Sequence, residues 1–246
     1  MSNAPAPPAS PSPFEIKKAV RQNCKVKMAL SGPSGSGKTY TALALGTRLS
    51  GSKATLLFDS ENDSSVKYAP TPDGKQAGFD FDHVPLKGDY HPKRIVQAIE
   101  HGVANGYGCL IFDSLTPFWN STNGFLEQLD NWLKRNNSKD SHGAWKHITP
   151  MYRAVVEKIV QAPIHIICTL RAKQDYSKEN GKVVKLGMAP EMRDGFEYEV
   201  DMHALLNTEN ELHFTKTRCS MVKDRVFQKP GQDLANILLD WANAGE

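Results

Sequence analysis

The residues with the clearest chemical potential lie at positions 32–39, where glycines, a lysine and a threonine follow a G-x-x-x-x-G-K-[ST] pattern. Glycines at this spacing let backbone N–H groups wrap around phosphate groups at the start of a helix. In such a loop the Lys38 ammonium reaches the β- and γ-phosphates, and the Thr39 hydroxyl helps to hold Mg²⁺. The residues expected to contact the nucleotide are Gly32, Pro33, Ser34, Gly35, Ser36, Gly37, Lys38, Thr39 and Tyr40.

The segments on either side of this loop have the composition that a phosphate-binding loop needs. Residues 24–31 form a short apolar stretch that predicts a strand, and residues 40–49 are rich in alanine and leucine and predict a helix. A plain Gly/Ser turn between a strand and a helix is the alternative, but the complete motif in this context favours a phosphate site. The sequence therefore predicts binding of a nucleoside triphosphate together with Mg²⁺.

Two further predicted strands end in acidic residues. Residues 109–112 form a buried strand that leads to Asp113, a position from which a carboxylate can hold Mg²⁺ through its water shell. Residues 54–58 form another strand, and Glu61 follows it in an acidic turn. Because Asp113 is assigned to the metal, Glu61 is the candidate general base for an attacking water. A turn-capping aspartate and a solvated acidic turn are the plainer alternatives for the two sites.

Strand-like and helix-like segments alternate along most of the chain, which is typical of a mostly parallel α/β sheet. Beyond those already named, strands are predicted over residues 81–86 and 164–169, and helices over 91–104 and 143–161. A break or kink is expected at Pro150 in the last of these helices.

The last third of the chain has a different pattern. A polar, basic segment over 174–186 predicts a hairpin that turns at residues 179–181. Alternating residues predict two strands over 199–206 and 211–216, and an amphipathic helix over 231–244 closes the sequence. The expected fold class is therefore α/β, with a C-terminal antiparallel strand extension.

Length and composition limit the class of protein. The 246 residues fit one domain over 14–246, which begins with a short helix over 14–21, after a Pro/Ala/Ser-rich segment over 1–13 that is expected to be disordered. A net charge of +3 is too small by itself to indicate a nucleic-acid partner, and the four cysteines lack metal-ligand spacing. No apolar run approaches the length of a membrane span and no signal peptide is visible, so a cytoplasmic location without a membrane partner is expected.

The order of these features resembles that of RecA-like recombinases, in which an acidic turn with a water-activating glutamate lies between the phosphate-binding loop and the metal-binding strand. The chain is most similar to phage-encoded RecA-like P-loop ATPases, of the type described as AAA-family ATP-binding proteins or single-strand annealing recombinases. The segments that carry the resemblance are 30–45, 57–62, 111–120, 144–152, 165–174 and 187–199. It implies a RecA-like core and a Mg²⁺-dependent ATPase that acts in phage-type recombination, annealing or repair, in the host bacterial cytoplasm, with Lys38 and Glu61 as catalytic residues.

The resemblance also implies a segment that binds single-stranded DNA. In RecA-like ATPases the strand after the metal-binding aspartate ends in a polar sensor of the γ-phosphate, and a basic DNA-binding loop follows. The usual glutamine is absent here, and Thr169 and Arg171 are the candidate sensors. The residues expected to bind the DNA backbone are Arg171, Lys173, Lys178, Lys182 and Lys185. A solvated charged face is the alternative for this run.

RecA-like ATPases assemble into rings or filaments, in which basic residues at a C-terminal strand end reach the γ-phosphate bound by the adjacent subunit. Lys216 and Arg218 match that place, so the resemblance implies self-association with active sites between subunits. Ordinary surface charges at a strand end are the alternative. A different class of function also stays open, an ATP-switched protein-interaction module whose hydrolysis DNA does not stimulate.

Overall fold

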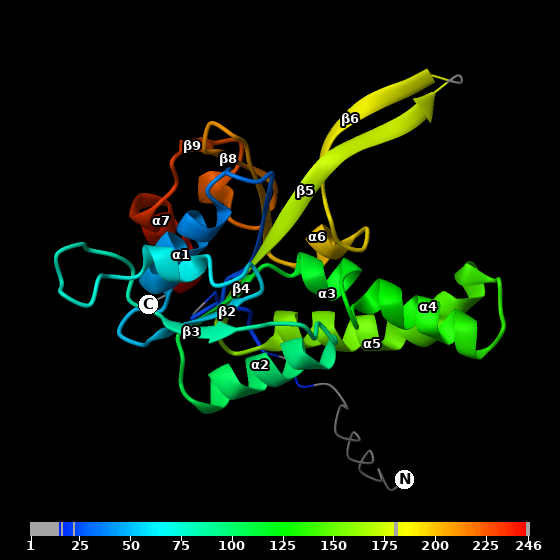
Figure 1. Cartoon of the computed structure of the whole chain (residues 1–246). Coiled ribbons are helices and arrows are strands. Elements are labelled where there is room, and N and C mark those ends of the chain that lie inside the picture. The colour runs from blue at the N-terminus through cyan, green and yellow to red at the C-terminus, as the bar shows by residue number, and fades with distance from the viewer. Residues whose placement is uncertain (1–14, 16, 22, 180–181, 245–246) are drawn as a thin grey trace, which may run out of the picture.

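This computed structural model describes residues 15, 17–21, 23–179 and 182–244, and only the backbone of 174–179 and 182–186 (Figure 1). The described residues form a nine-stranded sheet in which eight strands follow the order β3-β2-β4-β5-β1-β7-β8-β9, and β6 pairs with β5. The first six strands in this order (β3, β2, β4, β5, β1 and β7) run parallel to one another. Strands β8 and β9 extend the sheet with antiparallel pairing. The predicted fold class, a mostly parallel α/β sheet with an antiparallel C-terminal extension, is confirmed.

Most of the central strands are short and buried on both faces, as parallel strands between two layers of helices must be. The strand bounds are β1 (Lys27–Gly32), β2 (Thr55–Asp59), β3 (Asp82–Pro85), β4 (Cys109–Asp113), β5 (His165–Glu179), β6 (Lys182–Pro190), β7 (Met202–Leu206), β8 (Glu211–Thr217) and β9 (Val226–Gln228). Because β1, β2, β4 and the first part of β5 are parallel, their carboxyl ends meet at one edge of the sheet. Ligand-binding groups of such sheets gather at that edge.

Helices cover both faces of the sheet. Their bounds are α1 (Lys38–Leu49), α2 (Lys93–Ala104), α3 (Thr116–Asn120), α4 (Phe125–Arg135), α5 (Ser141–Gln161), α6 (Phe196–Glu199) and α7 (Gln232–Asn243), with 3₁₀ turns η1 (Ser65–Tyr68) and η2 (Ser220–Val222). Alternate residues of β1 divide between two cores, since Ala29 belongs to the cluster with α2 and α5 whereas Met28 and Leu30 belong to the cluster with α1 and α7. Both faces are thus closed by apolar side chains, which leaves the strand ends for polar chemistry.

Several segments differ from the expectation. Helix α5 runs through Pro150 without a break, and residues 15 and 17–21, which were expected to belong to a helix, form none. Helix α4 is not among the helices predicted from the sequence, although its buried residues Phe125 and Leu129 follow helical spacing. Among the described residues no helix is both long and apolar enough to cross a membrane.

Strand β5 continues past the sheet and forms a projecting two-stranded arm with β6, shown in yellow in Figure 1. Residues 166–171 of β5 pair in parallel with β1, and from residue 172 onward the strand pairs antiparallel with β6. We call residues 172–179 and 182–190 the arm. The two strands of the predicted hairpin are confirmed. The predicted turn includes residues 180 and 181, which lie outside the described residues. The first strand of the hairpin is a direct extension of a core strand.

Candidate active site

The phosphate-binding loop connects β1 to α1 and requires glycine at two of its positions. Gly37 directly precedes α1 with a φ of 87°, in the left-handed region that glycine adopts without strain. Gly32 has no room for a side chain, because a Cβ there would lie 2.5 Å from Ser36 Oγ and 2.6 Å from the Leu206 carbonyl oxygen. The loop therefore lies close against the end of β7 before it turns into the helix.

Lys38 begins α1, and its ammonium folds back onto the loop. Its Nζ donates to the carbonyl oxygen of Gly32 at 2.9 Å and to that of Pro33 at 2.8 Å. Burial lowers the pKa of Lys38, while the carboxylates of Asp113 and Glu61 oppose that shift. An ammonium whose partners are neutral carbonyls is well placed to exchange them for charged phosphate oxygens.

Asp113 ends β4 on the floor of the site and is only 1% exposed. The Thr39 hydroxyl donates to its Oδ2 at 2.7 Å, and the Thr169 hydroxyl donates to its Oδ1. Burial raises the pKa of Asp113, and these two hydrogen bonds oppose the shift. The peptide bond between Asp113 and Ser114 is cis. The structure thus brings together the two predicted metal-binding residues and one of the two candidate sensors.

Glu61 lies in the turn that follows β2, and several hydrogen bonds fix its position. Its backbone N–H donates to Asp59 Oδ1 at 2.7 Å, and the Ser114 hydroxyl donates to its Oε1 at 2.8 Å. Arg171 donates twice, from Nε to Oε1 at 3.0 Å and from Nη2 to Oε2 at 2.6 Å. The predicted general base and the second candidate sensor therefore form a bidentate ion pair.

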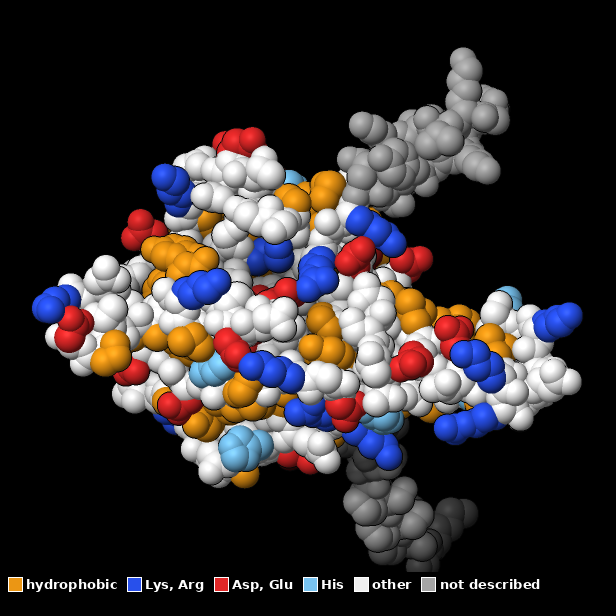
Figure 2. Space-filling model, viewed as in Figure 1, with side chains coloured by type: hydrophobic (Ala, Val, Ile, Leu, Met, Phe, Trp, Pro, Cys, Tyr) orange, Lys and Arg blue, Asp and Glu red, His pale blue; other side chains and the backbone are white. Residues whose placement is uncertain are grey.

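These side chains surround one cavity of about 360 Å³. Its lining consists of Ser34, Gly35, Gly37, Lys38, Thr39, Glu61, Ser64, Tyr68, Asp113 and Arg171. Figure 2 shows basic and acidic side chains next to one another near the middle of the visible face, below the root of the arm. Segments that are far apart in the sequence thus converge at the carboxyl edge of the sheet, with both cations and carboxylates in reach of a bound phosphate.

A second cavity of about 410 Å³ adjoins the first and shares Gly35, Gly37 and Tyr68 with it. Tyr40 lines it from the first turn of α1, as does Asn210 from the turn between β7 and β8. The Tyr40 ring packs edge-on against Tyr68, with 6.0 Å between ring centroids, and is 48% exposed. The predicted nucleotide contact at Tyr40 therefore offers an aromatic surface beside the phosphate loop.

The predicted DNA-binding residues divide between the site and the arm. Arg171 lies in the phosphate cavity and is paired with Glu61, whereas Lys173 is exposed on the arm. Lys178, Lys182 and Lys185 also belong to the arm, but their side chains lie outside the part of the chain that the structure describes.

The two residues predicted to act on a neighbouring subunit lie at the end of β8. The Lys216 ammonium donates to the carbonyl oxygens of Tyr198 and Val200, and Arg218 donates to Asp201 Oδ1 at 3.2 Å. Within one chain, the lining of the described phosphate cavity includes neither cation. Both side chains engage their own subunit in this structure.

The sequence profile of an AAA domain family matches residues 24–226. The chain belongs to this AAA domain family. The match spans the phosphate loop, the acidic turn, the Asp113 strand and the arm. No curated protein sequence matches the chain. The crystal structure of the RadB recombinase is among similar solved structures, with 15% sequence identity, a TM-score of 0.47, and coverage of 86% of this chain and 90% of that chain.

Two residues that position Glu61 are not predicted from the sequence, namely Asp59 and Ser114. Asp59 is 1% exposed and accepts hydrogen bonds from the backbone N–H groups of Glu61 at 2.7 Å and Ser65 at 3.0 Å, which shapes the turn. The Ser114 hydroxyl, directly after the neighbouring parallel strand β4, donates to the carboxylate of Glu61. The sequence does contain a feature from which each residue could be predicted. One is an aspartate two residues before Glu61 and the other is a serine directly after Asp113, and both lie at strand ends that the alternation pattern predicts.

Proposed function

We propose that this AAA domain is a Mg²⁺-dependent ATPase whose ATP hydrolysis is coupled to single-stranded DNA, in recombination, annealing or repair of the phage type. The observation that supports the ATPase activity is the convergence of Lys38, Asp113 and Glu61 on one cavity, although they come from three separate segments. A phosphate loop, a buried carboxylate and an anchored glutamate are the parts that in-line hydrolysis of a nucleoside triphosphate requires.

In the proposed reaction a water molecule attacks the γ-phosphorus of ATP in line with the bond to the bridging oxygen. The bond between the water oxygen and phosphorus forms as the bond to the bridging oxygen breaks, and Glu61 accepts the proton that the water loses. Lys38 stabilises the negative charge on the β- and γ-phosphate oxygens. The products are ADP and inorganic phosphate.

Mg²⁺ fits the donors that the site offers. The Thr39 hydroxyl and the Asp113 carboxylate are in direct contact at 2.7 Å beside the phosphate loop, and such oxygen ligands are those that Mg²⁺ prefers. When bound, the ion neutralises part of the charge on the phosphate oxygens.

The composition and placement of the arm support a role on nucleic acid. Four lysines lie on it, namely Lys173, Lys178, Lys182 and Lys185. A lysine-rich, two-stranded element that projects from the sheet can neutralise several phosphates of a single strand. Strand β5 contains Arg171, which lines the cavity, and then continues as the first strand of the arm. DNA bound to the arm and ATP bound in the cavity would therefore both contact β5.

Single-stranded DNA is expected to stimulate ATP turnover in a salt-sensitive manner. Each lysine that neutralises a DNA phosphate contributes roughly −0.7 to the slope of log binding constant against log salt. Replacing Lys173, Lys178, Lys182 and Lys185 by glutamine should therefore flatten that slope by up to about 3 and remove the stimulation. Turnover and DNA binding across a salt series measure both effects.

Two outcomes of this experiment separate the proposals. If the protein shows no salt-sensitive binding to single-stranded DNA with or without ATP, the DNA role is wrong. ATP turnover at a normal rate that DNA does not change would favour the second candidate, an ATP-switched protein-interaction module. In that candidate ATP binds in the same cavity and the arm binds a protein partner.

We also propose that the protein self-associates into a ring or filament and that Lys216 and Arg218 contact the γ-phosphate bound by the adjacent subunit. The bonds from Lys216 to two carbonyl oxygens would then be exchanged for bonds to phosphate on assembly. A cation supplied by another subunit makes hydrolysis depend on assembly.

Mixing two inactive variants tests this shared site. Lys216→Ala protein keeps Glu61, and Glu61→Gln protein keeps Lys216, so a mixture contains some interfaces with both groups intact. We expect ATP turnover to recover partly in the mixture. A double variant that carries both substitutions, mixed with Lys216→Ala protein, is the control that should stay inactive. Absence of rescue at every mixing ratio would contradict the role of Lys216 in the neighbouring site.

A further inference from the structure

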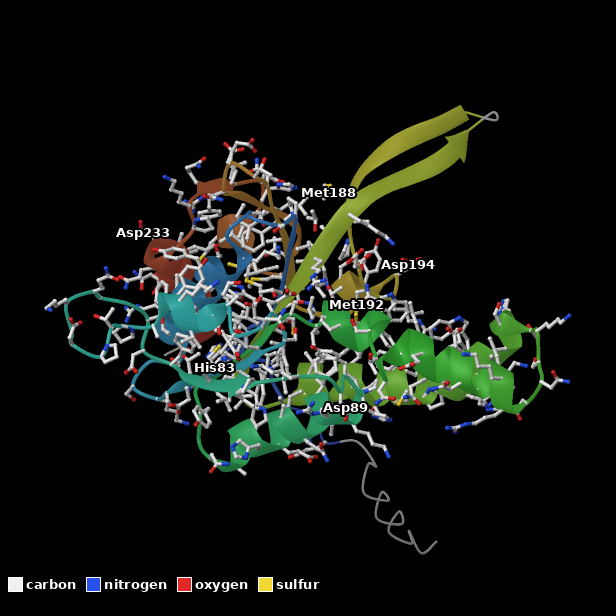
Figure 3. All side chains as sticks on the ribbon, in the orientation of Figure 1. His83, Asp89, Met188, Met192, Asp194 and Asp233 are labelled. Atoms are coloured by element: carbon white, nitrogen blue, oxygen red, sulfur yellow. The ribbon has the colours of Figure 1, made fainter. Side chains whose placement is uncertain are left out.

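Another cavity of about 360 Å³ lies outside the nucleotide site, between α3, the start of α5 and the segment that leads from β6 to α6. Its lining consists of Trp119 from α3, His142 and Trp145 from α5, and Arg193 and Asp194 from the segment after β6. We call this lining the aromatic pocket. Figure 3 shows Asp194 on the segment that leads from the root of the arm towards α3. A cavity of this volume is within the range that small ligands occupy.

Aromatic rings and one guanidinium form much of the wall of the aromatic pocket. The rings of Trp119 and Trp145 stack, with 5.8 Å between their centroids and 15° between their planes. The Arg193 guanidinium lies 4.9 Å from the ring centroid of Trp145 and 4.7 Å from that of Tyr152. Both indoles are only partly buried, so part of their surface is open to a ligand. Flat apolar surfaces of this kind suit a ligand that is itself a flat ring.

Two charged side chains add a donor and an acceptor to these flat surfaces. Arg193 donates from Nη2 to the Thr149 hydroxyl at 3.3 Å, whereas its Nη1 is buried and has no hydrogen-bond partner among the described residues. Burial of a guanidinium donor costs free energy unless an acceptor reaches it. Asp194 is exposed, and its ionised carboxylate only accepts hydrogen bonds. The aromatic pocket therefore fits a flat ligand with an acceptor for arginine and N–H donors for the carboxylate.

Nucleobases have this combination of groups, and guanine has it in the most favourable arrangement. The O6 and N7 atoms of guanine accept hydrogen bonds from arginine. Its N1–H and 2-amino groups lie side by side, so both can donate to one carboxylate. A phosphate group is a poor occupant, because the Asp194 carboxylate repels it. The part of a nucleic acid that would enter the aromatic pocket is therefore a base and not the backbone.

We propose that the aromatic pocket binds one unstacked base of single-stranded DNA, with a preference for guanine, beside the arm. The inference rests on the proposed role on single-stranded DNA and goes beyond it, because lysines that neutralise phosphates carry no information about sequence. The position of the pocket supports this occupant. The N–H of Glu191, two residues before Arg193, donates to the carbonyl oxygen of Arg171 at 2.7 Å, which places this segment at the root of the arm.

Short dT oligomers that differ in one central base test this pocket on the full chain by fluorescence anisotropy. The central base is thymine, guanine or hypoxanthine, which is guanine without its 2-amino group. We expect the guanine oligomer to bind about 5- to 50-fold more tightly than the all-thymine oligomer, with hypoxanthine between them. Asp194→Asn should reduce the guanine preference to less than about 2-fold and remove the difference between guanine and hypoxanthine. The same variant should change binding of the all-thymine oligomer by less than about 3-fold.

Asp233→Asn is the matched control, because Asp233 is an exposed aspartate in the first turn of α7, well apart from Asp194 in Figure 3. It should keep the full guanine preference. Equal binding of all the oligomers by the unchanged protein, or a guanine preference that survives Asp194→Asn, would overturn the base pocket but not the role of the arm on DNA. If no oligomer binds in a salt-sensitive manner, the proposed role on DNA fails and the base pocket fails with it, so the two failures are distinguished.

Discussion

Lys38→Ala is expected to weaken ATP binding by about 100-fold or more, since the ammonium would make at least two charge-assisted bonds to phosphate oxygens. The same change should leave the fold intact, because the bonds that Lys38 makes in this structure go to the carbonyl oxygens of Gly32 and Pro33 in its own loop. Equilibrium binding of a fluorescent ATP analogue measures the loss, and circular dichroism verifies the fold.

The exposed Lys53 provides the matched control for this substitution, because Lys53→Ala removes the same charge outside the phosphate cavity. We expect it to bind ATP normally. If Lys38→Ala protein retains normal ATP binding and turnover, the loop at 32–39 is not the phosphate site, and the assignment of the whole cavity fails with it.

Glu61→Gln is expected to lower ATP turnover by about 10²- to 10⁴-fold while ATP binding is kept or strengthened. Glutamine has nearly the same shape and retains an oxygen that can accept the Ser114 hydroxyl, but its amide does not accept a proton from water. Single-turnover hydrolysis with saturating protein separates this loss of chemistry from any change in affinity.

Glu100 offers a control of the same chemical type, because Glu100→Gln removes a carboxylate from a surface pair with Lys158. That variant should hydrolyse ATP at the normal rate. Near-normal turnover by the Glu61→Gln protein would move the general base elsewhere in the cavity.

The parts of the site that are local in sequence are the parts that sequence reasoning predicts. The phosphate loop needs only eight neighbouring positions, and its glycines are explained by the left-handed backbone at Gly37 and the close contact at Gly32. Asp113 and Glu61 follow short apolar strands, and parallel strands bring their carboxyl ends to a common edge. The alternation pattern therefore predicts that both residues lie at one edge of the sheet, and the pairing of β2 with β4 brings them together.

The pairing of Arg171 with Glu61 has no such local signal. It depends on the order of the strands, in which β5 lies between β4 and β1, and on the register that sets Arg171 opposite Gly32. Sequence patterns predict that a strand exists but give little information about its neighbours or its end, which is why the predicted strand over 164–169 is shorter than the fifteen residues of β5. Helix α4 is a different case, because the spacing of its apolar residues in the sequence is sufficient to predict it.

The continuity of β5 also constrains how this chain can change in evolution. Successive side chains of a strand point to opposite faces, so inserting one residue between the core pairing and the arm would turn every arm side chain over relative to Arg171. Inserting two would restore the facing at the cost of a longer arm. The irregular pairing between Asp175 and Tyr176 is the one described place on the arm where the register already shifts. Natural length variation of the arm is therefore expected beyond that point, where insertions and deletions do not disturb the facing of the residues nearest the site.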